Sequence, residues 1–141
     1  MRVLFDTNVV LDVLLNRQPH AGAAIQLFEQ VAQRRLPGLL GATTVTTIHY
    51  LAEKAVGRKQ AREHLETLLG LFEVAAVDRS VLTGALKLRF GDFEDAVLHE
   101  AAVHAGATAI VSRDVAGFRP SRLTVYAPGE LLTLLEAGPP T

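Results

Sequence analysis

Residues 2–15 read RVLFDTNVVLDVLL, a short apolar run that ends in an acid and continues directly into a second apolar stretch. Residues 2–6 have the length and the Val, Leu and Phe content of a buried strand. Asp6 stands where a helix N-cap is expected, and a helix should follow over residues 7–15. A buried strand that leads directly into a helix is the opening of an α/β fold.

The rest of the chain repeats this alternation of apolar strands and amphipathic helices. We expect further strands over 38–41, 71–77, 108–112 and 123–127, and further helices over 19–35, 43–56, 58–69, 78–90, 93–105 and from 128 onward. This pattern predicts a three-layer α/β/α sandwich around a mainly parallel, roughly five-stranded sheet. We expect one domain over residues 1–137 and a flexible tail over residues 138–141.

Single residues mark the expected helix ends. Thr43 or Thr44 would cap the helix that starts there, and Asp92 the helix that begins at residue 93. Pro19 occupies a helix-start position, and Gly70 would end the helix before it.

Composition narrows the classes of protein. The 141 residues include no cysteine, which excludes disulfides, thiolate metal sites and a cysteine nucleophile. Asp6 interrupts the apolar N-terminus, so this segment does not read as a signal peptide. No apolar run approaches the roughly 20 residues that a membrane span needs. We therefore expect a cytoplasmic protein that makes no membrane contact.

Charge argues against a general nucleic-acid binder, because the net charge is −1 and such proteins usually carry a basic excess. One local basic segment remains, in which Arg113, Arg119 and Arg122 fall within ten residues that hold a single acid, Asp114. The segment is either a solvated loop or a substrate-facing one. Arg113 and Arg119 are accordingly the candidate substrate-binding residues.

Three aspartates occupy related places in the expected fold. Asp6 ends the first strand, Asp114 follows the strand over 108–112, and Asp95 lies near a helix start. In parallel α/β sheets the ligand site lies beyond the carboxyl ends of the strands. Each acid also has a structural explanation: Asp6 as a helix cap and Asp114 as a turn residue. Asp95 would be the third residue of a helix that Asp92 caps.

None of these explanations accounts for all three acids at one rim of the sheet. Two carboxylates 4 Å apart repel by about 4 kcal/mol at an effective dielectric near 20. A fold keeps such a cluster when a cation neutralises it, or when one acid holds a proton. Hard oxygen ligands without cysteine or a histidine pair favour Mg²⁺ or Mn²⁺ over Zn²⁺. We therefore expect Asp6, Asp95 and Asp114 to lie close enough to share a cation.

Two segments resemble the motifs of PIN domains. DTNVVLDVLL, which starts at Asp6, resembles their opening motif, an Asp that ends strand 1 followed by Thr or Ser and Asn. DFEDAVLHEAAVHAGATAIVSRDVAGF, from Asp92 to Phe118, resembles their second half. There an Asp at a helix start precedes small residues, a Gly, an apolar strand, Ser/Thr-x-Asp and a Phe. The match keeps this order and spacing along the whole chain.

This resemblance implies a metal-dependent endoribonuclease, often the VapC-type toxin of a bacterial toxin–antitoxin pair. Asp6, Asp95 and Asp114 would hold one or two Mg²⁺ or Mn²⁺ ions, which activate a water for attack on an RNA phosphodiester. Asp92 would be a fourth acid or only the helix cap.

Neutral side chains and partners follow from the same resemblance. Asn8 and Ser112 would orient ligands or water. RNA is the implied substrate and an antitoxin protein the implied partner. The helices over 20–35 and 43–69 carry more apolar side chains than one sheet face covers, which, with the resemblance, predicts a homodimer.

The sequence departs from the family pattern at one position. Aligning GATTVTTIHYLAEK, residues 41–54, on the helix that usually carries a Glu places Thr47 at the Glu position. Glu53 lies six residues later and cannot substitute on the same helix without a large shift. Threonine can position a water but cannot neutralise a cation, so this departure predicts weak metal binding unless Asp92 compensates.

Other polar residues have simpler interpretations. We interpret His99 as a satisfied or exposed helix histidine, with a site-facing histidine as the alternative. Asp12 is interpreted as a solvated acid of the first helix, with a role in the site as the alternative. Arg58, Lys59 and Arg62 are interpreted as a solvated helix face.

Two further classes of function stay open. One is a catalytically silent PIN-like domain that binds RNA or a protein, which the threonine at position 47 favours. The other is a receiver-like phosphoacceptor, because an acid at a strand end with Mg²⁺ also suits an aspartyl phosphate. That fold needs a lysine after a late strand, where this chain offers Arg113 or Arg119.

Overall fold

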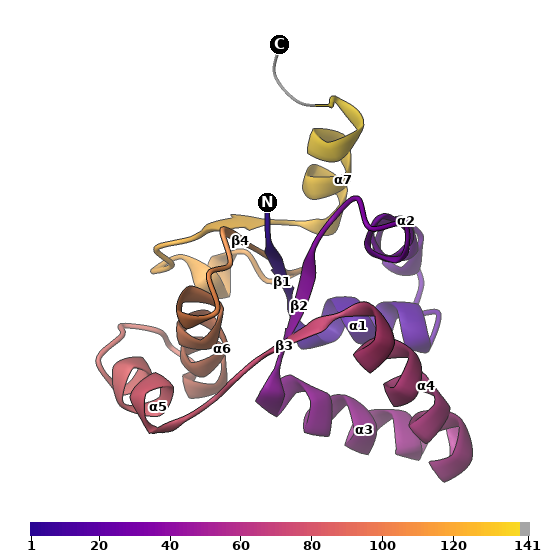
Figure 1. Ribbon diagram of the computed structural model, residues 1–141, viewed down its shortest axis with the longest axis horizontal. Coiled ribbons are helices and arrows are strands. Elements are labelled where there is room, and N and C mark those ends of the chain that lie inside the picture. Colours follow the sequence, from indigo (N-terminus) through magenta and orange to yellow (C-terminus); the bar gives the residue numbers. More distant parts are fainter. Residues whose placement is uncertain (139–141) are drawn as a thin grey trace.

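The computed structural model describes residues 1–138, which build a single five-stranded sheet (Figure 1). All neighbouring strands are parallel, in the order β3-β2-β1-β4-β5. The strands are β1 (Val3–Phe5), β2 (Gly38–Gly41), β3 (Glu73–Ala75), β4 (Ala109–Val111) and β5 (Thr124–Tyr126). The predicted fold class is therefore confirmed, and the sheet is parallel throughout.

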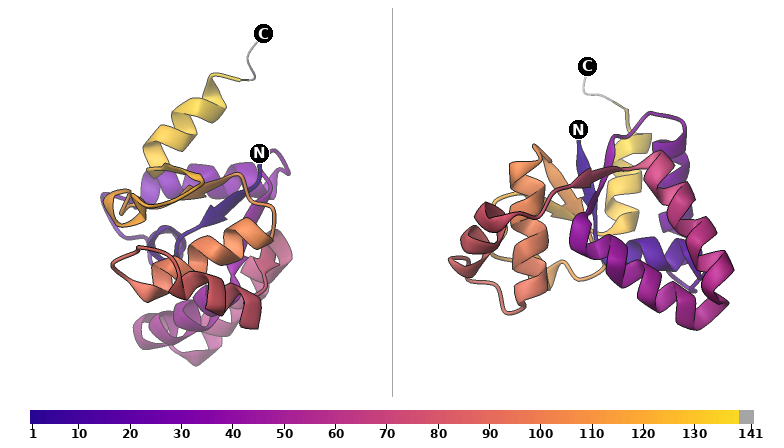
Figure 2. Two further views of the ribbon diagram at one scale, coloured as in Figure 1. Left: turned by 90° about the vertical axis from the view of Figure 1, so that its left-hand side faces the viewer. Right: turned by 60° about the horizontal axis from the view of Figure 1, so that its bottom comes forward.

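Helices cover both faces of the sheet. They are α1 (Thr7–Leu14), α2 (Ala21–Ala32), α3 (Ala42–Val56), α4 (Arg58–Leu71), α5 (Arg79–Leu86), α6 (Phe93–His104), the 3₁₀ helix η1 (Ala116–Phe118) and α7 (Pro128–Glu136). Figures 1 and 2 show α5 and α6 on one side of the sheet and α1, α2, α4 and α7 on the other. The helices α3 and α4 pack against each other as a hairpin.

The alternating side chains of the central strands build two separate cores. Val3 and Phe5 of β1 are fully buried in the core beneath α1, α2 and α7, and Leu4 between them is buried against α5 and α6. Because successive side chains of a strand point to opposite faces, an uninterrupted apolar strand requires cover on both sides. This requirement explains why RVLF was recognisable as a central strand.

An aromatic cluster closes the core beneath α2. The rings of Phe5, Phe28 and Phe72 meet edge to face, with centroids 5.1 to 5.8 Å apart. Gly38 of β2 lies directly under this cluster, since a Cβ there would stand 2.7 Å from the Phe72 ring. The glycine lets the ring approach the sheet.

The strand order places a topological switch point between β1 and β4. From β1 the chain builds outward through β2 and β3, and it then crosses back to add β4 and β5 on the other side. In open parallel sheets the crevice at such a point, outside the carboxyl ends of the strands, is where ligands bind. Asp6 follows β1 directly, and Ser112 follows β4.

Several expected helix boundaries need correction. The helix expected from Thr43 or Thr44 begins at Ala42 without a side-chain cap, and Thr44 is buried instead. The helix expected from Pro19 begins two residues later, at Ala21. The helix before Gly70 runs through this glycine to Leu71, which shortens the strand expected over 71–77. Packing of the α4 side chains on the core outweighs the local stop signal of a glycine.

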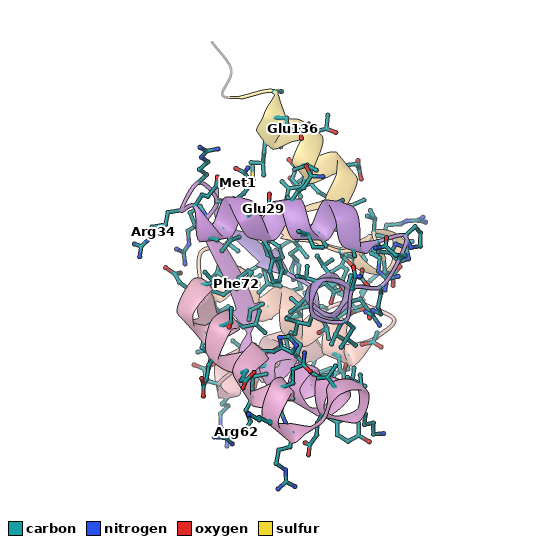
Figure 3. All side chains as sticks on the ribbon, turned by 90° about the vertical axis from the view of Figure 1, so that its right-hand side faces the viewer. Met1, Glu29, Arg34, Arg62, Phe72 and Glu136 are labelled. Atoms are coloured by element: carbon teal, nitrogen blue, oxygen red, sulfur yellow. The ribbon has the colours of Figure 1, made fainter. Side chains whose placement is uncertain are left out.

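Two further expectations concern the surface and the ends of the chain. No helix within residues 1–138 is long and apolar enough to cross a membrane. Arg62 extends outward from α4 (Figure 3), as expected for a solvated helix face. The division into a domain over 1–137 and a tail over 138–141 stays a prediction, since residues 139–141 lie outside the described part.

We predict that Gly38→Ala destabilises the protein by about 1–3 kcal/mol, because the added methyl group displaces the Phe72 ring from its cluster. Chemical denaturation monitored by circular dichroism measures this. Gly22→Ala on α2 is the matched control, because a Cβ there meets nothing within 4 Å. It should be neutral or stabilising by up to about 1 kcal/mol. Equal effects of the two substitutions would contradict the packing explanation.

Candidate metal centre

Asp6 is fixed at the end of β1 by two hydrogen bonds to its carboxylate. Its Oδ1 accepts from the Thr7 backbone N–H at 2.8 Å, so the residue caps α1 as expected. Its Oδ2 accepts from the hydroxyl of Ser112 at 2.7 Å, and the residue is only 9% exposed. Asp6 is therefore both a helix cap and a buried acid, and the structural explanation does not exclude a role in a site.

Ser112 ties the two strand ends together. Its Oγ donates to Asp6 and accepts from the backbone N–H of Asp114 at 2.9 Å. The Asp114 carboxylate in turn accepts from the Gly117 N–H at 3.0 Å, which turns the chain into η1. A Cβ at position 117 would collide with this carboxylate, which explains the glycine. The expected turn role of Asp114 is thus also present.

The start of α6 supplies two more acids. Asp92 is the N-cap, and its Oδ1 accepts from the Asp95 backbone N–H at 3.0 Å. Asp95 is the third helical residue, as expected. Because the cap holds the first turn of α6 in place, it also fixes the position of Asp95 relative to the sheet.

One cavity of about 500 Å³ brings these acids together. It lies where α1, α3 and α6 begin beside the loop after β4, and it also touches α5. Its polar lining consists of Asp6, Thr7, Asn8, Thr43, Thr44, Thr47, Asp92, Glu94, Asp95 and Asp114. The four aspartates singled out in the sequence therefore line the same cavity.

Burial and mutual repulsion perturb two of the carboxyl groups. Burial raises the pKa of Asp95 to about 6, with further upward contributions from the negative charges of Asp6, Asp92, Asp114 and Glu94. Burial also raises the pKa of Asp6, although its hydrogen bonds and the nearby Arg113 oppose the rise. These side chains therefore lie close enough to interact electrostatically, and the cavity disfavours full ionisation.

The donor atoms of the cavity fit a hard divalent cation. They are carboxylate, hydroxyl and amide oxygens, and no histidine of the described chain lines the cavity. The acids do not converge fully, however: within residues 1–138 no three Asp, Glu or His side chains form a ready-made ion site. That Asp6, Asp95 and Asp114 lie close enough to share a cation therefore stays a prediction.

The threonines of α3 face the same cavity. Thr47 lines it, which agrees with the register that placed this residue where the family usually has Glu, and its hydroxyl donates to the Thr43 carbonyl at 3.2 Å. Thr44 is 4% exposed and accepts from the Thr7 hydroxyl at 3.3 Å. The sequence had suggested Thr44 only as a cap. Its i, i+3 spacing from Thr47 on a helix could have assigned both to one face.

An apolar rim borders the acids of the cavity, and it was not predicted from the sequence. Leu51, Leu82 and Phe93 come from three different helices and are 38%, 41% and 49% exposed. Exposed apolar side chains carry no signal in a single sequence, because the periodicity of an amphipathic helix assigns them to the core.

The interpretation of Asp12 as a solvated acid is wrong. The residue is 1% exposed and bound by two guanidinium groups. Arg17 Nε donates to its Oδ1 at 2.9 Å, and Arg113 Nε lies 2.7 Å from its Oδ2. Arg17 also donates to the side-chain oxygen of Asn8 at 3.2 Å. Arg113, expected to bind substrate, is therefore engaged by Asp12.

The remaining candidates lie away from the cavity. Arg119 lines a different hollow together with Phe118. Arg122 pairs with Glu100 at 3.0 Å, and its backbone N–H donates to His99 Nε2 at 3.0 Å. His99 is fully buried, and burial lowers the pKa of its imidazole. The interpretation of His99 as a satisfied helix histidine holds for Nε2 only, because the buried Nδ1 has no hydrogen-bond partner among the described residues.

A protein-family model described as "PIN domain" matches residues 2–116. The matched span runs from the first strand to just beyond Asp114, and it includes all four aspartates of the cavity. None of the curated proteins compared with the chain matches it.

Solved structures share the fold at low sequence identity. VapBC2 from Rickettsia felis, bound to a DNA fragment from its promoter, is 15% identical over 90% of this chain and 98% of that chain, with a TM-score of 0.70. A toxin–antitoxin complex from Klebsiella pneumoniae is 19% identical over 89% and 97%, with a TM-score of 0.66. VapC20 from Mycobacterium tuberculosis, described as a sarcin–ricin loop cleaving toxin, is 15% identical over 77% and 86%, with a TM-score of 0.62.

We predict that Asp95→Asn stabilises the metal-free protein at pH 7.5 but not at pH 4.5. A carboxyl group whose pKa is raised on folding favours the folded state while protonated, and this contribution is lost as the pH rises through about 6. The asparagine does not ionise. Because solvent screens the partly exposed Asp95, the gain between the two pH values should be only about 1 kcal/mol.

Urea denaturation at the two pH values measures this difference. Glu66→Gln is the control, since Glu66 is exposed on α4 and lies outside the cavity. A pH-independent effect of Asp95→Asn would show that Asp95 does not carry the repulsion.

Proposed function

Because the chain belongs to the PIN domain family, whose model covers residues 2–116, we propose that it is an endoribonuclease that requires Mg²⁺ or Mn²⁺. The observation that carries the proposal is the set of four aspartates around one cavity at the switch point of the sheet. Such a set is costly without a cation, as the raised pKa of Asp95 indicates. The fold neighbour described as a loop-cleaving toxin supports RNA as the substrate.

On this proposal Asp6, Asp95 and Asp114 hold the ion, and Asp92 adds negative charge beside them. The bound ion would supply an activated water and neutralise the charge that develops on the phosphate. Ser112 keeps one Asp6 oxygen in a fixed orientation, and the α1 N-terminus fixes the other. The carboxylate therefore cannot swing away when the ion departs.

Thr47 and Asn8 contribute uncharged polar groups to the lining. The Thr47 hydroxyl can place a water but adds no charge. The Asn8 side-chain oxygen accepts from Arg17, so its NH₂ group is the part left to donate. We propose that this NH₂ group contacts a phosphate oxygen or an ordered water rather than the ion, because an amide nitrogen cannot ligate a cation.

Protein partners are part of the proposal. One fold neighbour is a toxin–antitoxin complex and another is VapBC2 bound to promoter DNA, which supports an antitoxin partner for this chain. We also propose a homodimer. The helices that were expected to carry more apolar side chains than the sheet can cover do expose apolar side chains, which supports a dimer. These side chains are Ile25, Tyr50, Leu51 and Leu69.

A catalytically silent PIN-like domain is the second candidate. The observation that favours it is Thr47, which puts a hydroxyl in the cavity where the family usually has a carboxylate. The alternative of a receiver-like phosphoacceptor is no longer supported, because the chain matches the PIN domain model and Arg113 forms an ion pair with Asp12.

We predict that Asp6→Asn reduces Mn²⁺-dependent cleavage of single-stranded RNA at least a hundredfold and leaves the fold intact. The substitution removes the most buried carboxylate of the cavity but keeps its size and the cap of α1. Cleavage is followed on a fluorescently labelled RNA, with a chelator as the metal-free reference.

Asp78→Asn is the matched control. Asp78 also caps a helix, α5, through its Oδ1 and the Val81 N–H, but it does not line the cavity. It should keep wild-type activity. Chelator-sensitive cleavage by Asp6→Asn at the wild-type rate would remove Asp6 from the ion site, and chelator-insensitive cleavage would reject the metal dependence.

We predict that Thr47→Glu tightens Mn²⁺ binding and raises the cleavage rate, because it adds a charged ligand to a cavity that already contains position 47. Isothermal titration calorimetry with Mn²⁺ measures the affinity. Thr46→Glu is the control, one residue along α3 and outside the cavity lining. If Thr47→Glu binds Mn²⁺ no better than wild type, Asp92 already fills the role of the usual Glu.

A further inference from the structure

Asp12 and its two arginines form a buried ion cluster beside the cavity but outside its lining. Asp12 lies one helical turn after Asn8 on α1, while Arg17 follows the helix and Arg113 lies in the loop after β4. Burying a carboxylate to 1% exposure is costly without cationic partners, and the two guanidinium groups supply these partners. One acid thus joins two segments that are about 100 residues apart in the chain.

Each arginine connects Asp12 to a different part of the cavity. Arg17 Nη2 donates to the backbone carbonyl and to the side-chain oxygen of Asn8, both at 3.2 Å. Arg113 stands between Ser112 and Asp114, the residues whose hydrogen bonds connect the end of β4 to Asp6. Asp12 is therefore connected through one arginine to Asn8 and through the other to the loop that carries Asp114.

A gain in stability does not by itself explain why the chain has this ion cluster. A buried ion pair gains little over well-packed apolar residues of the same volume, because desolvation offsets most of the attraction. Its geometry is also incomplete: Arg113 Nη2 donates to Asp12 Oδ1 at 3.3 Å, whereas Asp12 Oδ2, 2.7 Å from Arg113 Nε, accepts no hydrogen bond from the described residues. What such a cluster provides is a fixed arrangement of the groups attached to it.

We propose that Asp12 is a positioning residue, which acts through Arg113 on the segment from Ser112 to Asp114 and through Arg17 on Asn8. The inference rests on the proposed function. Through Arg113 it sets where the Asp114 carboxylate stands relative to Asp6. Through Arg17 it fixes the face of the Asn8 amide that meets the substrate.

The two arms have different expected effects. Arg113→Gln should weaken Mn²⁺ binding about tenfold or more, because partners that orient ligands typically contribute 10–100-fold to metal affinity. It should also speed hydrogen exchange of the Asp114 amide, which donates to Ser112. Arg17→Gln should lower kcat and leave Mn²⁺ affinity nearly unchanged, because Asn8 does not hold the ion.

Asp12→Asn should produce both effects. If Asp12 acts through Arg113, the two substitutions share one interaction, and the double variant should bind Mn²⁺ little worse than Arg113→Gln alone. Should Asp12→Asn fail to fold, the two single arginine variants still decide the matter, since both side chains are partly exposed.

Arg2→Gln is the matched control. It removes the same charge and breaks the Arg2–Glu73 ion pair of 2.7 Å at the opposite end of β1. It should alter neither metal affinity nor kcat.

The measurements are Mn²⁺ titration calorimetry, cleavage kinetics and amide hydrogen exchange on the full chain at a temperature where circular dichroism shows each variant folded. Wild-type Mn²⁺ affinity, kcat and Asp114 exchange in both arginine variants would overturn the inference. A wild-type protein that neither binds Mn²⁺ nor cleaves RNA would overturn the proposed function. Faster Asp114 exchange in Arg113→Gln would then still support the positioning of the loop.

Discussion

The hydrogen bond from the Ser112 hydroxyl to the Asp6 carboxylate is the interaction on which the site depends. It spans the two central strands at the point where the sheet reverses its direction of growth. Because Ser112 also accepts from the Asp114 N–H, it fixes where the second strand-end acid leaves the sheet. Backbone pairing of β1 with β4 sets this register, so the core that holds the strands together also positions the acids.

The repulsion among the carboxylates of the cavity follows from this placement. Two hydrogen-bond donors fix the Asp6 carboxylate, and the start of α6 places Asp92 and Asp95 at the same cavity. The partial positive charge of a helix N-terminus favours carboxylates there, which offsets part of their repulsion. Burial, and after it the neighbouring negative charges, still raise the pKa of Asp95 to about 6. The metal-free protein thus stores an unfavourable interaction that a divalent cation would relieve.

Periodicity and strand-end chemistry predicted the fold and the four acids, because both leave direct traces in a sequence. An uninterrupted run such as RVLF needs cover on two faces, and an acid at its end stands where ligands bind in parallel sheets. Other features left no such trace. Nothing in the sequence distinguishes a solvated Asp12 from a buried one, since its arginine partners are 5 and 101 residues away. The apolar rim could not be predicted either, because a single sequence does not show whether a phenylalanine such as Phe93 lies in a core or at the mouth of a cavity.

The position of Thr47 shows why counting ligands along the sequence is not enough to judge a metal site. A helix that begins at Ala42 presents residue 47 to the cavity, so a hydroxyl stands where the resemblance to PIN domains implies a carboxylate. The cavity nevertheless retains four aspartates and Glu94, because Asp92 caps α6 and lines the cavity at the same time. At a helix cap an acid is favoured without any ligand. Asp92 can therefore add charge to the site while its own position is secured by the fold, and metal binding need not stabilise it.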